Sequence, residues 1–302
     1  MVVFGLDERK VAMRILSIDG GGIRGIIPAT VLCRLPKSIR FDAIAGTSTG
    51  GILALGMAAE IKPERLLKLY TEKGKEVFKR SFFRSTLGRF GISGPTYQNK
   101  HLLRLLREVF GERTLGSLNM TVIIPVYDTQ KRQLKVIGSW SLPKTRLVDV
   151  AMATSAAPTF FDPWELDGRE YIDGGVGANN PALLAAAWMS RHYGRAVKMK
   201  LLSIGTGTSV DPINSKGWGK FGWAPKIASV LMDGNADATE SIAKFTHLDF
   251  GEYHRMNVAL GSFGASAAMD DVSETNIERL ALCGELLARK IPKRVLEWGA
   301  DG

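Results

Sequence analysis

Residues 41–59 have the sequence Phe-Asp-Ala-Ile-Ala-Gly-Thr-Ser-Thr-Gly-Gly-Ile-Leu-Ala-Leu-Gly-Met-Ala-Ala, in which a G-x-S-x-G motif joins two apolar runs. The first run is typical of a short buried strand, and the second favours a buried helix. A serine on a sharp turn between a strand and a helix forms a nucleophile elbow. Gly46 and Gly50 leave room for the turn, and Ser48 is expected near the helix N-terminus, where the helix dipole favours a developing negative charge. An ordinary turn is the alternative.

A glycine-rich loop follows the first predicted strand, Arg14 to Ile18, which is short and largely apolar. The loop runs from Asp19 to Gly25, and the bare backbone N–H groups of Gly20 to Gly22 suit an anion site in a cleft. The loop also fits G-x-G-x-x-G, the dinucleotide-binding pattern. That pattern needs an acidic residue at the end of a second strand, whereas Asp42 opens its strand. An anion site is therefore the favoured interpretation.

A second turn carries a carboxylate. Tyr171 and Ile172 form an apolar pair that leads into Asp173, and Gly174 and Gly175 follow it. The aspartate therefore enters a turn with no side chains behind it, which mirrors the serine elbow. A plain capping role for Asp173 in that turn is the alternative.

Further elements are predicted from periodicity and from glycine and proline breakers. One helix is expected to begin at Pro28, and others are expected at 63–78, 100–110, 149–158, 182–189, 225–232 and 273–289, the last with Ser273 as its N-cap. Strands are expected at 121–127, 133–137 and 200–204, and a loop is expected at 79–98.

The composition indicates a globular chain: 45% of its 302 residues are hydrophobic and 23% are charged, which suits one large α/β domain or two small ones. The N-terminus lacks the apolar core of a signal peptide, and the longest uncharged run, 43–59, is too interrupted for a membrane span. The two cysteines and four histidines have no metal-ligand spacing, so no metal is expected. Reduced thiols and a cytoplasmic location are the simplest expectation.

The net charge of +10 predicts a surface that attracts phosphates. Ten Lys or Arg and three Glu lie between Lys73 and Arg113, and aromatic residues are interleaved with them. Such a stretch suits a lipid interface or single-stranded nucleic acid, and a solvated helix face in front of core aromatics is the simplest explanation. We expect peripheral contact with a membrane surface and no nucleic-acid partner.

Taken together, these segments resemble the patatin-like phospholipases, in particular the bacterial type. The matching pieces are Asp19 to Gly25, Gly46 to Gly50, Ala153 to Pro158, Asp173 to Val176, Asn179 to Pro181, Gly205 to Gly207 and Met269 to Ser273. Each piece is short, but they occur in the family's order over nearly the whole chain. The resemblance implies an N-terminal extension at 1–13, a patatin-like domain at 14–291 and a C-terminal tail at 292–302.

The resemblance also implies a three-layer α/β/α sandwich with a mostly parallel central sheet, and a Ser–Asp dyad without histidine. Ser48 is then the nucleophile, and Asp173 takes its proton. The implied oxyanion site consists of the backbone amides of Gly20, Gly21 and Gly22, with Arg24 nearby. An ordinary aspartate, with a pKa of about 3.9, is a poor base at neutral pH, so a desolvated Asp173 with a raised pKa is expected.

For Arg24 two roles are open: an ion pair with a carboxylate, or a contact with a substrate phosphate. The expected function is a serine acyl hydrolase of the phospholipase A type, which acts on membrane phospholipids, at the inner face of the membrane, without a cofactor. One alternative is the same hydrolase gated by a cyclic nucleotide activator in antiviral defence. Others are a Ser-Asp-His esterase that uses His247 or His254, and a non-catalytic nucleotide-binding protein that uses Gly20 to Gly25.

Overall fold

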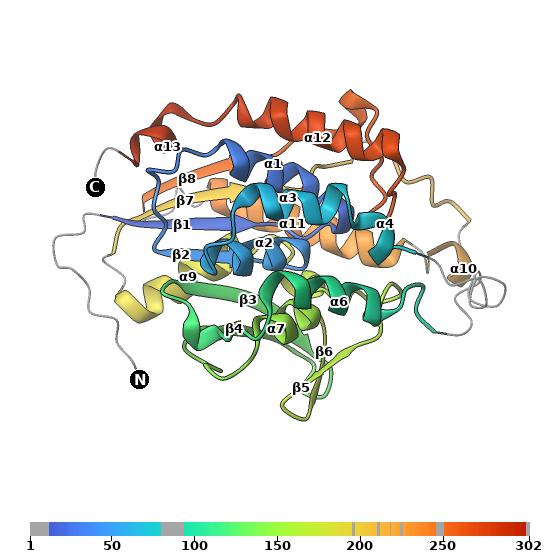
Figure 1. The fold of residues 1–302 in the computed structure, drawn as a ribbon. Coiled ribbons are helices and arrows are strands. Elements are labelled where there is room, and N and C mark those ends of the chain that lie inside the picture. Colours follow the sequence, from blue (N-terminus) through green and yellow to red (C-terminus); the bar gives the residue numbers. More distant parts are fainter. Residues whose placement is uncertain are drawn as a thin grey trace.

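The apolar strand before the glycine loop, β1 (Met13–Ile18), lies at the centre of the parallel part of the sheet (Figure 1). β1 pairs in parallel with β2 (Ala43–Gly46) on one side and with β7 (Met199–Ile204) on the other. β3 (Thr121–Asp128) and β8 (Gly251–Met256) extend the parallel part outwards. Most side chains of β1, β2 and β7 are buried on both faces, as apolar strands of a parallel sheet are.

The structure is a computed structural model that describes residues 12–79, 94–194, 197–209, 212–217, 219–223, 226–245 and 251–299. Its central sheet has the strand order β5-β6-β3-β2-β1-β7-β8, with β4 also paired to β3. The five strands from β3 to β8 run parallel, and the strands at the other end are antiparallel. The mostly parallel sheet that was expected is therefore confirmed.

β3 changes its partner along its length. One edge of β3 pairs with β4 (Gln133–Gly138), and the other edge pairs first with β2, where Ile123 lies opposite Ala45. Further along that same edge β3 pairs with β6 (Arg169–Asp173), and Val126 lies opposite Asp173. β5 (Trp164–Leu166) pairs with the outer edge of β6. Because β6 occupies the edge of β3 just beyond the end of β2, Asp173 arrives next to the turn that follows β2.

Helices cover both faces of the sheet (Figure 1). The helices associated with one face are α1 (Ile26–Arg34), α2 (Thr49–Ala58), α3 (Pro63–Thr71), α4 (Gly74–Val77), α6 (Asn99–Phe110), α7 (Leu147–Thr154) and α12 (Glu274–Ala288). The helices associated with the other face are α8 (Gly175–Ala178), α9 (Ala182–Tyr193) and α11 (Ile227–Phe245). The short helices α10 (Lys220–Trp223) and α13 (Lys293–Glu297) lie at opposite ends of the molecule in Figure 1. This is the three-layer α/β/α sandwich that the resemblance implied.

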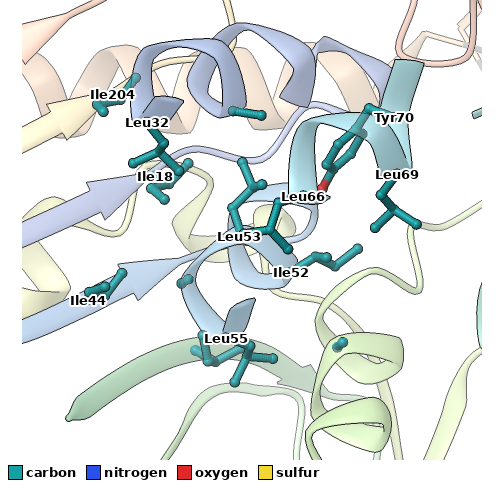
Figure 2. Packing of buried hydrophobic residues seen from close by; sticks show 14 of the residues in the cluster. Ile18, Leu32, Ile44, Ile52, Leu53, Leu55, Leu66, Leu69, Tyr70 and Ile204 are labelled. Atoms are coloured by element: carbon teal, nitrogen blue, oxygen red, sulfur yellow. The ribbon is translucent and has the colours of Figure 1, made fainter. Parts of the chain in front are cut away.

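The larger apolar core lies between the sheet and the layer that contains α2. Figure 2 shows Ile18, Ile44 and Ile204 from three neighbouring strands on the side of the sheet that faces Leu53 of α2. Leu66 of α3 also packs against α2, where a Cβ on Gly56 would lie 2.5 Å from Leu66 Cδ2. Nine of the ten residues of α2 are buried, as in a helix that is apolar all round. A helix enclosed in this way holds the elbow before it in a fixed position.

Several expected elements differ in extent from those observed. The helix expected at 63–78 is two helices, α3 and α4, and Gly74 at the start of the second packs so close to Ile23 that a Cβ would lie 2.7 Å from its Cδ1. The helix expected at 149–158 ends at Thr154, before Pro158. Most of the loop expected at 79–98 lies outside the described residues.

The C-terminal third differs more. The helix expected at 225–232 begins at Ile227 and continues to Phe245, and β8 was not predicted. In the middle third, β5 was not predicted either. The predicted N-cap is confirmed, because Ser273 Oγ accepts a hydrogen bond from the Asn276 amide. The packed core extends past the expected boundary at 291, since Val295 and Trp298 are buried in it.

Candidate active site

Ser48 occupies the turn between β2 and α2 with φ of 55° and ψ of −122°, a strained conformation for a residue with a side chain. Both motif glycines are required by backbone contacts. A Cβ on Gly46 would lie 2.1 Å from Gly50 O, and a Cβ on Gly50 would lie 2.2 Å from Ile18 O. Stored strain at a G-x-S-x-G turn between a strand and a helix favours a nucleophile elbow over an ordinary turn.

Side chains from distant segments hold this turn. Thr154 Oγ1, at the end of α7, accepts a hydrogen bond from the Ser48 amide (3.1 Å) and donates one to Pro125 O (2.8 Å). Thr47 Oγ1 donates to Ala178 O (2.7 Å) in the segment after Asp173. Sequence reasoning assigned no role to Thr154, although it belongs to one of the matching motifs.

Asp173 is the last residue of β6 and is fully buried. The Gly175 amide donates a hydrogen bond to Asp173 Oδ1 (2.7 Å), whereas Oδ2 receives no hydrogen bond of regular geometry from the described residues. Gly174 is required here, because a Cβ on it would lie 2.1 Å from Pro125 O. Burial raises the pKa of Asp173 to about 7, and the nearby Ser48 hydroxyl and the Gly175 amide oppose that rise. The direction is the one expected from the sequence.

Ser48 and Asp173 line the same cavity, which opens to solvent. Its walls are mainly apolar, and they include Ile52, Leu69, Val77, Phe78, Phe161 and Met232. Among the described residues that line it, Asp173 is the only carboxylate, and none is Lys, Arg or His. Such a cavity suits an extended apolar group whose reacting end lies near the serine.

The glycine loop packs directly against the elbow. A Cβ on Gly20 would lie 3.2 Å from Ser48 Cβ, and a Cβ on Gly22, whose φ is +59°, would lie 2.2 Å from Met269 O. The Gly20 amide donates to Asn179 O (3.1 Å) and is thus engaged. Gly22 lines the cavity, and within the described part of the chain the amides of Gly21 and Gly22 donate to no backbone carbonyl outside the regular elements.

A buried ion pair anchors the start of this loop. Arg255 on β8 donates to both carboxylate oxygens of Asp19, through Nη1 at 2.9 Å and Nη2 at 2.6 Å. The same guanidinium donates to Ser203 Oγ (2.9 Å) and to Glu240 Oε2 (3.1 Å). Both members of the pair are almost fully buried. No local pattern indicates this pair, because β8 was not predicted.

Arg24 is buried, and one of its two open roles is observed. Its Nη2 lies 3.8 Å from Asp233 Oδ1, and its Nη1 donates to Ala267 O (3.4 Å). His254 lies on β8, where Nε2 is 3.2 Å from Glu252 Oε2, and it is not among the residues that line the cavity. His247 lies outside the described residues.

Two kinds of feature are absent from the residues that the structure describes. No group of three or more His, Cys, Asp or Glu there is arranged to hold a metal ion. In that same part of the chain, no helix combines the length and the apolar character needed to cross a bilayer.

Known proteins resemble this chain along most of its length. A family model described as patatin-like phospholipase matches residues 16–186, which include Ser48 and Asp173. Patatin-like protein 2 of Oryza sativa subsp. indica is 31% identical over 97% of this chain and 88% of its own length. Patatin-like protein 2 of Arabidopsis thaliana is 32% identical over 93% of this chain and 84% of its own length.

Among solved structures, human GIVD cytosolic phospholipase A2 in complex with methyl gamma-linolenyl fluorophosphonate resembles this chain with a TM-score of 0.50 at 13% identity. The likeness covers 98% of this chain and 59% of that one, so this chain spans less than two thirds of that protein, and it concerns the fold alone. The family model covers more than half of the chain, and the plant relatives cover nearly all of it. This chain therefore belongs to the patatin-like phospholipase family.

Proposed function

We propose that this protein is a serine lipid acyl hydrolase of the phospholipase A type, which cleaves fatty acyl esters of membrane phospholipids. The observation that carries the proposal is that a serine on a strained elbow and a buried aspartate with a raised pKa line one apolar cavity. Family membership supports the reaction class, and the apolar walls suit the acyl chain of the substrate.

In the first half-reaction Asp173 accepts the proton of the Ser48 hydroxyl while Oγ attacks the ester carbonyl. The amides of Gly21 and Gly22 suit the role of oxyanion donors, because they lie in the loop that touches Ser48 and the Gly20 amide is already engaged. When the tetrahedral intermediate collapses, the C–O bond to the glycerol backbone breaks. The leaving alkoxide takes the proton from Asp173, and an acyl-enzyme remains on Ser48.

In the second half-reaction Asp173 takes a proton from water, which attacks the acyl-enzyme. The Ser48 oxygen leaves with the proton that Asp173 held, and the free fatty acid departs. A carboxylate with a pKa of about 7 is well matched to both transfers near neutral pH, since it is half ionised there.

The test compares Ser48→Ala and Asp173→Asn with the unaltered chain on a panel of phospholipids, with released fatty acids measured by mass spectrometry. Both variants are expected to lose fatty acid release while keeping their circular dichroism spectrum. Ser155→Ala is a matched control, because Ser155 is a second buried serine on the same cavity. A fluorophosphonate should label Ser155→Ala but not Ser48→Ala, and label on Ser48→Ala would remove Ser48 as the nucleophile.

The finer predictions from the sequence stay predictions: the bacterial type, the cytoplasmic location at the inner face of the membrane, and the phosphate contact of Arg24. Activation by a cyclic nucleotide is tested by titrating cyclic dinucleotides against lipid hydrolysis. A chain that is fully active without them is a constitutive enzyme.

A further inference from the structure

We propose that the outer face of α11 and the lysines around the cavity rim form a docking face for an anionic phospholipid bilayer. The docking face consists of Ile227, Leu231, Lys79, Lys100 and Lys226. The inference rests on the proposed function, since it names the surface through which a membrane lipid reaches the cavity.

The apolar part of the docking face continues the cavity wall. Ala228 and Met232 lie one turn apart on α11 and are buried, and Met232 lines the cavity. Ile227 and Leu231 precede them by one position each, so they point about 100° away around the helix. They are 42% and 52% exposed. Leu231 is thus the residue before Met232, which lines the cavity, so an acyl chain that leaves a bilayer at Leu231 is close to the cavity lining.

The lysines lie on three elements that also line the cavity. Lys79 follows the lining residue Phe78 directly, Lys100 lies one half-turn before the lining residue Leu102 on α6, and Lys226 precedes α11. All three lysines are exposed, and none forms an ion pair with a carboxylate among the described residues. Figure 1 shows α4 and α10, which precedes α11, toward the same end of the molecule.

Positive charges gather around His101 on α6, the residue after Lys100. Burial and the charges of Lys100, Arg104 and Lys79 lower the pKa of His101, and Glu76 alone opposes them. Residues 212–232 contain three lysines, and one aspartate stands at each end of this stretch; of these two, Asp233 lies 3.8 Å from Arg24 Nη2. Exposed aliphatic side chains on α11, together with lysines that form no ion pair among the described residues, match the interface of a bilayer that carries anionic head groups, where apolar groups insert and ammonium groups stay at the phosphates.

The experiment uses the full chain with Ser48→Ala, so that vesicles stay intact, and measures binding to vesicles of phosphatidylcholine with and without phosphatidylglycerol. Ile227→Ser with Leu231→Ser is expected to weaken binding to mixed vesicles about tenfold or more, because two inserted aliphatic side chains are lost. The matched control is Leu282→Ser with Leu296→Ser, whose side chains are 49% and 43% exposed on α12 and α13. The control should bind as the parent does.

The lysines are tested separately by Lys79→Gln, Lys100→Gln and Lys226→Gln in one chain. This variant should lose at least about tenfold in affinity for vesicles with phosphatidylglycerol and should lose most of the salt dependence of binding. Its weaker affinity for pure phosphatidylcholine should not change. Equal losses on both vesicle types would contradict the electrostatic part of the proposal.

Two further readouts separate this proposal from the proposed function. With Ser48 intact, the Ile227 and Leu231 variant should hydrolyse a soluble short-chain ester with unchanged kcat/KM. If the parent hydrolyses no ester but vesicle binding still depends on the docking face, the proposed function fails and the docking face stands. If vesicle binding is the same in the variant and the parent, the docking face is refuted. If the parent sediments as a dimer and only the Ile227 and Leu231 variant sediments as a monomer, the face binds a second copy of this chain. That result would also refute the proposal.

Discussion

The pH dependence of the acylation step tests the role of Asp173 most directly. Its pKa is raised from an ordinary 3.8 to about 7 by burial. The serine can transfer its proton only to the ionised carboxylate, so kcat/KM should rise with pH and level off above pH 7. At pH 6 about one tenth of the carboxyl groups are ionised, so the rate should be about one tenth of its plateau. With an ordinary pKa the rate would be flat from pH 6 upwards.

The assay is stopped-flow acylation by a soluble chromogenic ester between pH 5 and 9, with fluorescence of the protein as a check that the fold persists. Tyr70 is the other titratable residue among the described lining residues, and burial raises its pKa, so it does not titrate in this window. A rate that stays flat from pH 6 to 9 would refute the reasoning, because it would mean that Asp173 is solvated and has an ordinary pKa. If the rate of Asp173→Asn still falls at acidic pH in the same way, the group that titrates is another residue.

The same raised pKa has a consequence for stability. Between pH 3.8 and about 7 the folded chain holds a proton on Asp173 that the unfolded chain has released, so this group makes the fold less stable as pH rises through that window. The rise in the pKa of Asp173 from 3.8 to about 7 corresponds to roughly 4 kcal/mol of folding stability, which is present below pH 3.8 and fully lost above pH 7. Asp173→Asn should therefore raise the free energy of unfolding at pH 8 by roughly 2–4 kcal/mol and change it little at pH 4. Equal effects at both pH values in urea titrations would contradict the desolvation argument.

The remaining predictions concern the residues that position the site. Arg255→Met leaves the buried carboxylate of Asp19 without its partner and should cost about 3–5 kcal/mol of folding stability in urea titrations. Thr154→Val removes the acceptor for the Ser48 amide while keeping the shape, and it should lower kcat for a soluble ester about tenfold with little change in KM. Gly50→Ala brings a methyl group into the backbone of β1 and should abolish soluble expression or lower the Tm by more than about 10 °C.

The chemistry at the two turns could be predicted because each turn constrains its own residues. A Cβ on Gly46 or Gly174 would lie 2.1 Å from a backbone oxygen, so only glycine is tolerated at either position. Constraints of this kind appear in the sequence as short motifs. The aspartate and the serine of the two turns then stand out as the polar side chains that those turns present.

The supporting contacts could not be predicted because they join residues far apart in the chain. Thr154 is 106 residues from Ser48, and Arg255 is 236 residues from Asp19. No local pattern indicates such a partner, since any buried threonine or arginine has the same appearance in a sequence. The extent of α11 was hidden for a different reason. Residues 233–237 have the sequence Asp-Gly-Asn-Ala-Asp, which is typical of a loop, yet they lie inside a helix.

The absence of a histidine from the proposed dyad follows from how the carboxylate is surrounded. In a Ser-His-Asp triad the imidazole takes the serine proton, because a solvated or well-bonded carboxylate is too weak a base. Here one oxygen of Asp173 is held by the Gly175 amide, and the other is buried without a regular donor. No cation among the described residues lines the cavity to stabilise the charge. The resulting pKa of about 7 makes the carboxylate itself an adequate base. The desolvation that makes it adequate also destabilises the fold at neutral pH, so activity and stability should change in opposite directions whenever water or a cation reaches Asp173.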